Sequence, residues 1–329
     1  MHKKRPKVFI TCKLPALIEQ RMNELFDMHP IYHPTPLKRD KLINALQNAD
    51  VLVPTLTDCL DRNLLAHAGP NLKLIANFGN GVDHIDLAYT SQRGILVTNT
   101  PNVLTEDTAD MACALILALP RRLMAGTQLL TSSSQWGGWS PTSMLGTRLR
   151  GKTLGILGLG RIGIAVARRV KSFGLNIHYH NRQPISPQIA KELNATYWER
   201  LDDMLPYIDI LSIHCPATNE THGLLDKGRI ARLPKNAYVV NTARSGIINE
   251  SALAASIETG HLAGAALDVF EYQPCINPAL LALAKKGKVL LLPHMGSATL
   301  ESRIEMGERV IINIRAFFDH HRPPDRILP

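Results

Sequence analysis

The 329-residue sequence predicts an α/β fold with two domains, each built on a doubly wound parallel sheet. Three observations lead to this fold class. Short apolar runs of strand type alternate with helical segments along the chain, which is typical of parallel sheets. The length fits about two domains. Residues 151–182 have the glycine spacing of a strand–helix–strand unit that binds a dinucleotide.

The composition indicates a globular protein without a membrane partner. Apolar residues make up 45% of the chain and charged residues 20%, which is ordinary for a globular domain. The longest uncharged apolar run, residues 111–119, is too short to span a bilayer. The basic start of the chain resembles the beginning of a signal peptide, but Lys13, Pro15 and Glu19 interrupt any apolar stretch after it. We therefore expect a cytoplasmic protein.

The cysteine spacing argues against a protein built on metal sites or disulfides, and the distribution of charge argues against a nucleic-acid-binding protein. The five cysteines are scattered and form no CxxC pair, so the sequence predicts neither a metal site nor a disulfide framework. The net charge of +9 raises the question of nucleic acid, but the basic residues are spread out and no nucleic-acid-binding module is visible. An anionic cofactor and an anionic substrate explain part of this charge.

The first domain begins with alternating elements but has no glycine fingerprint. Residues 6–10 are expected to form a strand, residues 14–26 a helix, and residues 51–54 and 72–76 further strands. Residues 78–83 follow the last of these strands, with a glycine on either side of an asparagine. This is either a turn whose amides face a ligand or a plain strand-to-helix connection.

A change of domain is expected near residue 100. Residues 94–98 form a predicted strand, residues 99–102 contain helix breakers, and residues 105–119 form a long apolar helix. Residues 131–150 are predicted to be a loop. This loop carries two tryptophans, Trp136 and Trp139, and tryptophans on loops more often pack at interfaces than take part in chemistry.

The glycine fingerprint follows an apolar strand at residues 154–157. Gly158 permits the tight turn, Gly160 lets the backbone approach a pyrophosphate, and Gly163 lets helix and strand pack closely. A helix over residues 164–170 then directs its N-terminal amides at the phosphates, before the next strand at residues 175–179. This is a Rossmann-like unit.

The end of the second strand of this unit predicts the form of the cofactor. Sites that bind NAD place an acidic residue about twenty positions after the last glycine, where it binds the ribose 2′-hydroxyl. Here Arg182 stands nineteen positions after Gly163, and no carboxylate is nearby. A guanidinium binds a 2′-phosphate, so we hypothesise a preference for NADPH over NADH. The alternative is that Arg182 is only a solvated surface residue.

Four further predicted strands end in polar residues. Ligands of open α/β sheets bind at the carboxyl ends of the strands, so these residues indicate a site. The strands, residues 209–213, 237–240, 264–267 and 289–292, are followed by His214, Arg244, Asp268 and His294 respectively. Arg244 suits a carboxylate partner, and His294 is the candidate general acid and base. A terminal helix over residues 301–319 and an extended tail complete the chain.

These motifs together resemble the D-isomer-specific 2-hydroxyacid dehydrogenases, and among them most closely the glyoxylate/hydroxypyruvate reductases. The resemblance covers nearly the whole chain and rests on residues 77–83, 155–163, 241–246, 264–271 and 291–297. It implies two Rossmann-like domains with a cleft between them. Residues 1–100, completed by residues 296–329, would bind the substrate, and residues 101–295 would bind the dinucleotide.

The resemblance also implies roles for individual residues. His294 would protonate the substrate carbonyl, Arg244 would hold the substrate carboxylate, and Asp268 would hold the nicotinamide carboxamide. The amides around Asn80 and Gly81 would bind the carboxylate too. The implied cofactor-binding residues are Thr108, Gly158, Leu159, Gly160, Arg161, Ile162, Gly163, Asn181, Arg182, Gln183, His214, Cys215, Pro216, Thr221, Thr242, Ala243, Arg244, Asp268, His294, Gly296 and Ser297.

The same resemblance implies a homodimer. Trp139 matches a tryptophan that enters the active site of the partner subunit in such reductases and would contact the substrate there.

One position departs from the family pattern. The family places a glutamate five residues after the carboxamide aspartate, where it pairs with the histidine, whereas this chain has Gln273. A carboxylate raises the pKa of a neighbouring histidine, and an amide does not. Gln273 either orients His294 while lowering its pKa, or Glu271 replaces it, or the substrate or favoured direction differs. We prefer the first interpretation.

Three functions are compatible with these residues. The first is an NADPH-dependent reductase of glyoxylate, hydroxypyruvate or a related 2-keto acid, with NADH as a possible alternative cofactor. The second is an oxidoreductase resembling formate dehydrogenases, which have a glutamine at the position of Gln273. The third is a dinucleotide-sensing regulator on the same fold. Arg244 and His294 together favour an enzyme, because a sensor needs neither as a pair.

Overall fold

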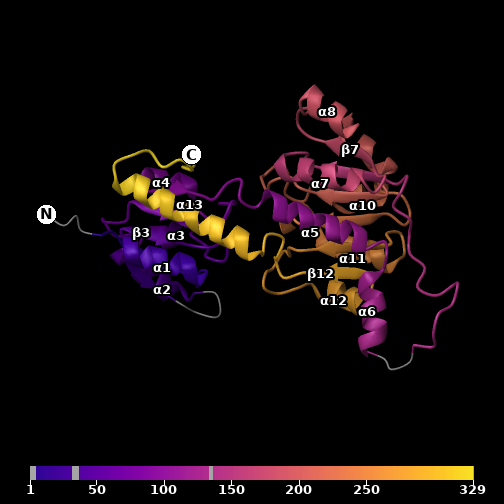
Figure 1. Cartoon of the computed structure of the whole chain (residues 1–329), viewed down its shortest axis with the longest axis horizontal. Helices are drawn as coiled ribbons and strands as arrows, with labels where there is room; N and C mark the ends of the chain where they lie inside the picture. The colour runs from indigo at the N-terminus through magenta and orange to yellow at the C-terminus, as the bar shows by residue number, and fades with distance from the viewer. Residues whose placement is uncertain (1–4, 32–36, 133–135, 329) are drawn as a thin grey trace. The chain divides into compact units, whose positions relative to one another are not determined.

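The computed structural model describes residues 5–31, 37–132 and 136–328. The chain divides into two compact units, each with its own sheet (Figure 1). Unit 1 comprises Met1–Leu104 and Ala298–Pro329, and unit 2 comprises Thr105–Ser297.

Unit 1 is built on a five-stranded parallel sheet with the strand order β2-β1-β3-β4-β5. Its strands are β1 (Lys7–Ile10), β2 (Asp27–Pro30), β3 (Val51–Val53), β4 (Leu74–Ala76) and β5 (Leu96–Thr98). Its helices are α1 (Ala16–Leu25), α2 (Arg39–Asn48), α3 (Arg62–Leu65), α4 (Leu87–Gln92) and α13 (Leu300–Phe318). One apolar core joins α1 and α13 to the sheet, and a second core joins α2 and α3 to it, so helices cover both faces.

Unit 2 contains a seven-stranded parallel sheet with the order β12-β11-β10-β9-β6-β7-β8. Its strands are β6 (Thr153–Leu157), β7 (Asn176–His180), β8 (Thr196–Trp198), β9 (Ile210–Ile213), β10 (Tyr238–Asn241), β11 (Gly264–Leu267) and β12 (Val289–Leu291). Its α-helices are α5 (Thr105–Ala118), α6 (Leu123–Ser132), α7 (Arg161–Lys171), α8 (Pro187–Leu193), α9 (Leu201–Met204), α10 (Lys227–Arg232), α11 (Glu250–Glu258) and α12 (Pro278–Lys285), with short 3₁₀ turns at Leu205–Tyr207 and Ser245–Ile247.

The cores of unit 2 also lie on two faces of the sheet. One contains buried residues of α5 and α7, and the other contains buried residues of α10, α11 and α12. Both sheets are therefore parallel and covered by helices, which confirms the predicted α/β class. All ten strand pairings recorded among the described residues are parallel.

The structure corrects several predicted boundaries. Helix α7 begins at Arg161, directly after the fingerprint turn, rather than at residue 164. Helix α6 runs to Ser132, although the sequence predicts a loop from residue 131. None of its residues with a described burial is buried, so no core contact of the described side chains marks this helix.

The chain leaves unit 1 after Leu104, later than the predicted change near residue 100. The reason is packing with α13. Val103 and Leu104 join the core that includes α13, and the Ser302 hydroxyl donates a hydrogen bond to the Val103 carbonyl (3.1 Å).

Across the described ranges, no single helix is long and apolar enough to cross a membrane. The bent pair formed by Thr105–Ala118 and Leu123–Thr131 passes the same test by length and composition only.

Candidate active site

The glycine-rich turn between β6 and α7 is shaped to receive an anion. Gly158 has a φ of +95°, and a Cβ there would stand 2.5 Å from the Cys215 backbone nitrogen. A Cβ on Gly160, in contrast, would meet no atom within 4 Å, so the backbone is open to a ligand at this point. The first α-helical bond runs from Ile164 N–H to the Gly160 carbonyl. The amides of the first turn therefore point out of the helix, as a pyrophosphate site requires.

Asn181 fastens this turn to the end of β7. Its amide oxygen accepts a hydrogen bond from Leu159 N–H (2.6 Å), and its Nδ2 donates to the Leu159 carbonyl (3.2 Å). The side chain of Asn181 is thus engaged with the chain itself, whereas Arg182 and Gln183 are exposed. Of these three predicted cofactor-binding residues, Arg182 and Gln183 therefore present their side chains to solvent.

The two residues directly after β9, His214 and Cys215, are both uncharged at physiological pH. His214 Nε2 lies 2.8 Å from the Ser212 hydroxyl, and burial lowers the pKa of His214 to about 4. Burial also raises the pKa of Cys215 to about 11, so its thiol stays protonated and is a poor nucleophile. The Thr221 hydroxyl donates to the Pro216 carbonyl (2.7 Å) and closes the following turn.

The turn after β10 carries Arg244. The buried Asn241 side chain accepts a hydrogen bond from Ala243 N–H (3.0 Å) and donates to the Arg244 carbonyl (2.9 Å). The half-buried guanidinium of Arg244 donates through Nη1 to the Ala243 carbonyl (2.9 Å). The Thr242 hydroxyl is buried and has no hydrogen-bond partner within the described residues. A buried polar atom of this kind usually has a ligand or water as its partner, and this one lies where the sequence predicts the cofactor.

Asp268 follows β11 and holds the turn after β12, which carries His294. The Asp268 carboxylate accepts hydrogen bonds from Met295 N–H and Gly296 N–H, both at 2.7 Å. Asp268 is 1% exposed, and this burial raises its pKa above the ordinary value although the two backbone bonds and His294 act in the opposite direction. A Cβ on Gly296 would lie 3.0 Å from Asp268 Oδ2 and 3.7 Å from the Thr108 methyl group. Asp268 therefore fixes the backbone on which His294 is placed.

The structure places Gln273 beside the catalytic candidate. Gln273 Oε1 lies 3.4 Å from His294 Nδ1, a long but correctly paired donor and acceptor when Nδ1 is protonated. Glu271 instead faces the start of α11, where its backbone N–H donates to Glu250 Oε1 (2.6 Å) and its own carboxylate lies 3.5 Å from Glu250 N–H. This geometry agrees with the interpretation in which Gln273 orients His294.

In unit 1, the turn of residues 78–83 follows β4 and is fastened by asparagine side chains. Asn77, which is fully buried, donates through Nδ2 to the carbonyls of Gly79 (3.0 Å) and Gly81 (2.9 Å). Asn99 Nδ2 donates to the Asn80 carbonyl (2.8 Å). The predicted residues Asn80 and Gly81 are therefore held through their carbonyl oxygens, which leaves their amides for another partner.

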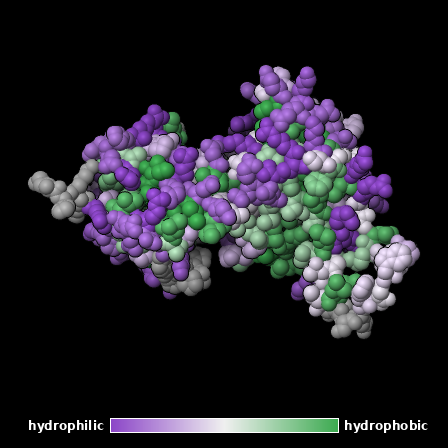
Figure 2. Space-filling view, viewed as in Figure 1, coloured by the Kyte–Doolittle hydropathy of each residue, from purple (hydrophilic) through white to green (hydrophobic). Residues whose placement is uncertain are grey.

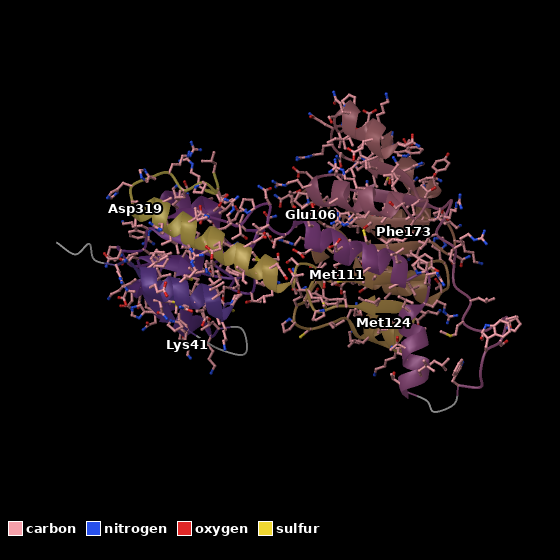
Figure 3. All side chains as sticks on the ribbon, in the orientation of Figure 1. Lys41, Glu106, Met111, Met124, Phe173 and Asp319 are labelled. Atoms are coloured by element: carbon pink, nitrogen blue, oxygen red, sulfur yellow. The ribbon has the colours of Figure 1, made fainter. Side chains whose placement is uncertain are left out.

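Trp139 lies outside these turns, on the segment after α6. It is 84% exposed, and the same region carries further exposed apolar side chains, namely Leu130, Trp136 and Leu145. Figure 2 shows white and green residues at the end of α6 and along the following segment, in contrast to the purple surface around α8. Met124 on α6, which Figure 3 labels, is also partly exposed.

The order of the sheet in unit 2 brings most of the predicted residues together. Strands β10, β11 and β12 are neighbours, so Arg244, Asp268 and His294 follow adjacent strand ends. Strands β6 and β9 are also neighbours, which places Gly158 against Cys215. Within the described ranges, no group of three or more His, Cys, Asp or Glu side chains is arranged to hold a metal ion.

Sequence reasoning missed the residues that hold these turns, which are Asn77, Asn99 and Asn241. The sequence offered one signal for them, since each is an asparagine at the end of a buried strand or directly after it. A buried side-chain amide needs hydrogen-bond partners, and the nearest partners are the carbonyl and N–H groups of the following turn.

Comparison with known proteins identifies the family. Residues 113–296 match the model of the D-isomer specific 2-hydroxyacid dehydrogenase NAD binding domain. The chain is 41% identical over 329 residues to a glyoxylate reductase of Aeropyrum pernix, covering 98% of this chain and 96% of the relative. A glyoxylate reductase of Thermococcus litoralis is 39% identical over 327 residues, with 98% and 97% covered.

Solved structures agree with this assignment. A D-isomer specific 2-hydroxyacid dehydrogenase from a Polaromonas species superposes with a TM-score of 0.92 at 37% identity, covering 98% of this chain and 100% of the other. An NADPH-dependent glyoxylate/hydroxypyruvate reductase from Sinorhizobium meliloti, in complex with NADP and malonate, superposes with a TM-score of 0.82 at 32% identity, covering 98% and 97%. The matched sequence, the two parallel sheets and the strand-end residues lead to one conclusion: the chain belongs to the D-isomer-specific 2-hydroxyacid dehydrogenases, a family of enzymes that use a nicotinamide dinucleotide.

Proposed function

We propose that the enzyme reduces small 2-keto acids, glyoxylate and hydroxypyruvate among them, to 2-hydroxy acids with NADPH. The observation that carries this proposal is the placement of Arg244 after β10 and His294 after β12, the strands on either side of β11, with Gln273 Oε1 3.4 Å from the imidazole. A fixed cation and a titratable acid are what reduction of an anionic keto acid requires. The glyoxylate reductases among its relatives support the substrate class.

In this proposal each side chain has a defined role in the reaction. The bound dinucleotide supplies a hydride to the carbonyl carbon. His294 gives a proton from Nε2 to the carbonyl oxygen, which becomes the hydroxyl group, while Nδ1–H stays directed at Gln273 Oε1. Arg244 binds the substrate carboxylate and polarises the keto oxygen, and the amides of Asn80 and Gly81 bind the carboxylate as well. Unit 1 would thus contribute backbone amides for the substrate, and unit 2 would hold the dinucleotide and contribute Arg244 and His294.

The residues of unit 2 fit a dinucleotide. The open approach at Gly160 suits the pyrophosphate, and the Thr242 hydroxyl, which has no hydrogen-bond partner in the described part of the chain, suits a polar group of the nicotinamide. Asp268, whose carboxylate accepts backbone hydrogen bonds from Met295, Gly296 and His294 and keeps lone pairs for another donor, suits the carboxamide.

The preference for NADPH rests on Arg182. This side chain is exposed directly after β7, where no carboxylate precedes it. It contributes, after the hydrogen bond from Thr218, to holding the pKa of Glu220 below its ordinary value. Fluorescence titration should give tighter binding of NADPH than of NADH, and Arg182→Ala should remove about tenfold or more of that preference. Equal affinities of the unmodified enzyme for both would contradict the assignment.

We also propose that two copies associate through the exposed apolar segment after α6. Trp139 and its apolar neighbours on this segment are exposed in the single chain, and such patches mark interaction surfaces. Light scattering coupled to gel filtration should give twice the mass of the chain, and Trp139→Ala should weaken substrate binding without lowering affinity for NADPH. A monomer at micromolar concentration would contradict the proposed dimer.

Measurements of initial rates test whether the enzyme catalyses the proposed reduction. Oxidation of NADPH and NADH is followed with glyoxylate, hydroxypyruvate and pyruvate in separate reactions. Fast turnover of glyoxylate with NADPH is expected. If no keto acid is reduced with either cofactor, the proposal fails; oxidation of formate with NADP⁺ or NAD⁺ would then favour the formate-dehydrogenase-like alternative, and cofactor binding without any turnover would favour the sensing regulator.

A further inference from the structure

The turn of residues 78–83 uses all of its central carbonyl groups within the protein. The Gly79 carbonyl accepts from Asn77 Nδ2 (3.0 Å) and from Thr100 N–H (3.1 Å). The Asn80 carbonyl accepts from Asn99 Nδ2, and the Gly81 carbonyl accepts from the second N–H of Asn77 Nδ2. Three successive peptide groups are thereby held by their oxygen atoms.

The direction of the matching amides follows from peptide geometry. In a trans peptide the carbonyl and the N–H of the next residue point in opposite directions. Because the carbonyls of residues 79, 80 and 81 face the side chains that hold them, the N–H groups of Asn80, Gly81 and Val82 face away. None of these three N–H groups has an acceptor in the part of the chain that the structure describes. Successive amides that face out of a turn are suitable donors for an anion.

Asn77 is the central support of this arrangement. Its side chain is 0% exposed, and both of its N–H groups are used on the turn. Its Oδ1 lies 3.1 Å from His84 Nε2, so the imidazole donates to the amide oxygen and fixes which way the amide faces. A Cβ on Gly79 would lie 3.2 Å from Asn77 Nδ2, which is closer than side chains usually approach, so glycine leaves the room this bond needs.

We infer that Asn77 and Asn99 are positioning residues that aim the three amides of Asn80, Gly81 and Val82 at the carboxylate of the substrate. This inference rests on the proposed reduction of 2-keto acids and extends it, since it adds Val82 to the binding groups and assigns the two asparagines that hold them. Neither asparagine touches the substrate. Both act through the carbonyl oxygens on the opposite side of the turn.

The hydrogen bonds of Asn77 require an amide and not a carboxylate at this position. An aspartate at position 77 would set negative oxygens against the carbonyls of Gly79 and Gly81 and would supply no N–H group. It would also place a negative charge behind an anion site. Asn77→Asp is therefore expected to be at least as harmful to substrate binding as Asn77→Ala.

Steady-state kinetics of three variants test the inference. With NADPH saturating, Asn77→Ala is expected to raise the KM for glyoxylate about tenfold or more, because a carboxylate loses charge-assisted hydrogen bonds. Asn99→Ala, which frees one carbonyl, is expected to raise it about threefold. kcat should change less than KM in both, since the carboxylate is bound alike before and during the chemical step. The NADPH dissociation constant should stay unchanged.

Thr90→Val is the matched control. Thr90 is 1% exposed and belongs to unit 1, and its hydroxyl donates to the Leu87 carbonyl (2.9 Å), away from the turn. This variant also loses one buried hydrogen bond, so it should lower stability and leave the KM unchanged. A KM for Asn77→Ala within twofold of the unmodified enzyme, or an equal rise of KM in Thr90→Val, would overturn the inference.

A second measurement separates this inference from the proposed reaction. Acetate, which carries a carboxylate and no carbonyl to reduce, should shift the amide resonances of Asn80, Gly81 and Val82 in an NMR titration, and Asn77→Ala should reduce these shifts. If the enzyme reduces no 2-keto acid but these shifts appear, the proposed reaction fails and the positioning role stands. If the enzyme reduces glyoxylate but acetate leaves the three amides unchanged, the positioning role fails alone.

Discussion

The turn after β4 in unit 1 and the turns after β10 and β12 in unit 2 present different atoms to their surroundings. The turn in unit 1 offers backbone amides, at Asn80, Gly81 and Val82. The turns in unit 2 offer charged or titratable side chains, Arg244 and His294. All three turns are held by buried polar side chains that bond to the backbone, namely Asn77, Asn241 and Asp268.

This difference illustrates two ways in which a protein can provide a binding group, through a side chain or through the backbone. A cation or an acid is carried by the residue itself, so its replacement removes the function directly. Amides belong to every residue except proline, so their use depends on the neighbours that turn them outward. In unit 1 substitutions are therefore expected to affect binding through the supporting asparagines, and in unit 2 through the residues that carry the charge.

The largest expected effect concerns His294. His294→Gln removes the proton donor of the proposed reaction, and kcat should fall by about 10²–10⁴-fold, the usual contribution of general acid catalysis. The NADPH dissociation constant, measured by fluorescence, should change little. A variant that keeps more than a tenth of the original kcat would show that another group supplies the proton.

Arg244→Lys should have the next largest effect. A lysine keeps the charge but replaces the planar fork by a single point charge, so a carboxylate loses its two parallel hydrogen bonds. We expect kcat/KM for glyoxylate to fall by about tenfold to a hundredfold. Unchanged kcat/KM would mean that Arg244 contributes only charge.

Gln273→Glu should change the pH dependence rather than the maximum rate. A carboxylate at 3.4 Å from His294 Nδ1 would stabilise the imidazolium and raise the pKa of His294. Reduction requires protonated His294, so the rate should persist to a pH about one unit higher than in the unmodified enzyme. Superimposable profiles of kcat against pH for the two proteins would contradict the pairing.

The smallest expected effect lies away from all three turns. Arg229 donates to Asp202 (3.0 Å), and this hydrogen bond lowers the pKa of Asp202 below its ordinary value of 3.8. The pair therefore stabilises the fold above pH 3.8 and loses its contribution as the pH falls through the lowered pKa. Asp202→Asn should lower the free energy of unfolding by less than about 1 kcal/mol at pH 7.

Urea denaturation at pH 7 and pH 3 measures this effect, and the difference between the two proteins should shrink at pH 3. The kinetic constants for glyoxylate should not change. A loss of activity in Asp202→Asn would show that general stability, and not the turns, controls the kinetic constants.

The sequence alone predicted those parts of the site that depend on residues close together in the chain or on the order of the strands. The glycine spacing and the helix after it required only neighbouring residues, and the parallel order of the strands explains why Arg244, Asp268 and His294 follow adjacent strands. The short strands of unit 1 and their alternation with helices were equally visible, because buried strands are continuous apolar runs.

The remaining features depend on contacts between distant segments. The bond from Asn99 to the Asn80 carbonyl joins residues nineteen positions apart, and Asp268 accepts its bonds from Met295 and Gly296, which lie more than twenty-five positions away. Such side-chain-to-backbone bonds leave no periodic pattern in the sequence. The predicted loop at residues 131–150 was wrong at its start, because α6 continues to Ser132 although none of its residues with a described burial is buried.

The dissociation constant of acetate from the enzyme–NADPH complex tests most directly whether the two units divide their tasks in this way. Acetate presents only a carboxylate, and titration of ¹³C-labelled acetate by NMR measures its binding without turnover. The account predicts that Asn77→Ala weakens acetate binding about tenfold, whereas His294→Gln changes it by less than about threefold. Equal affinity for acetate in Asn77→Ala and the unmodified enzyme, or a greater loss in His294→Gln, would contradict it.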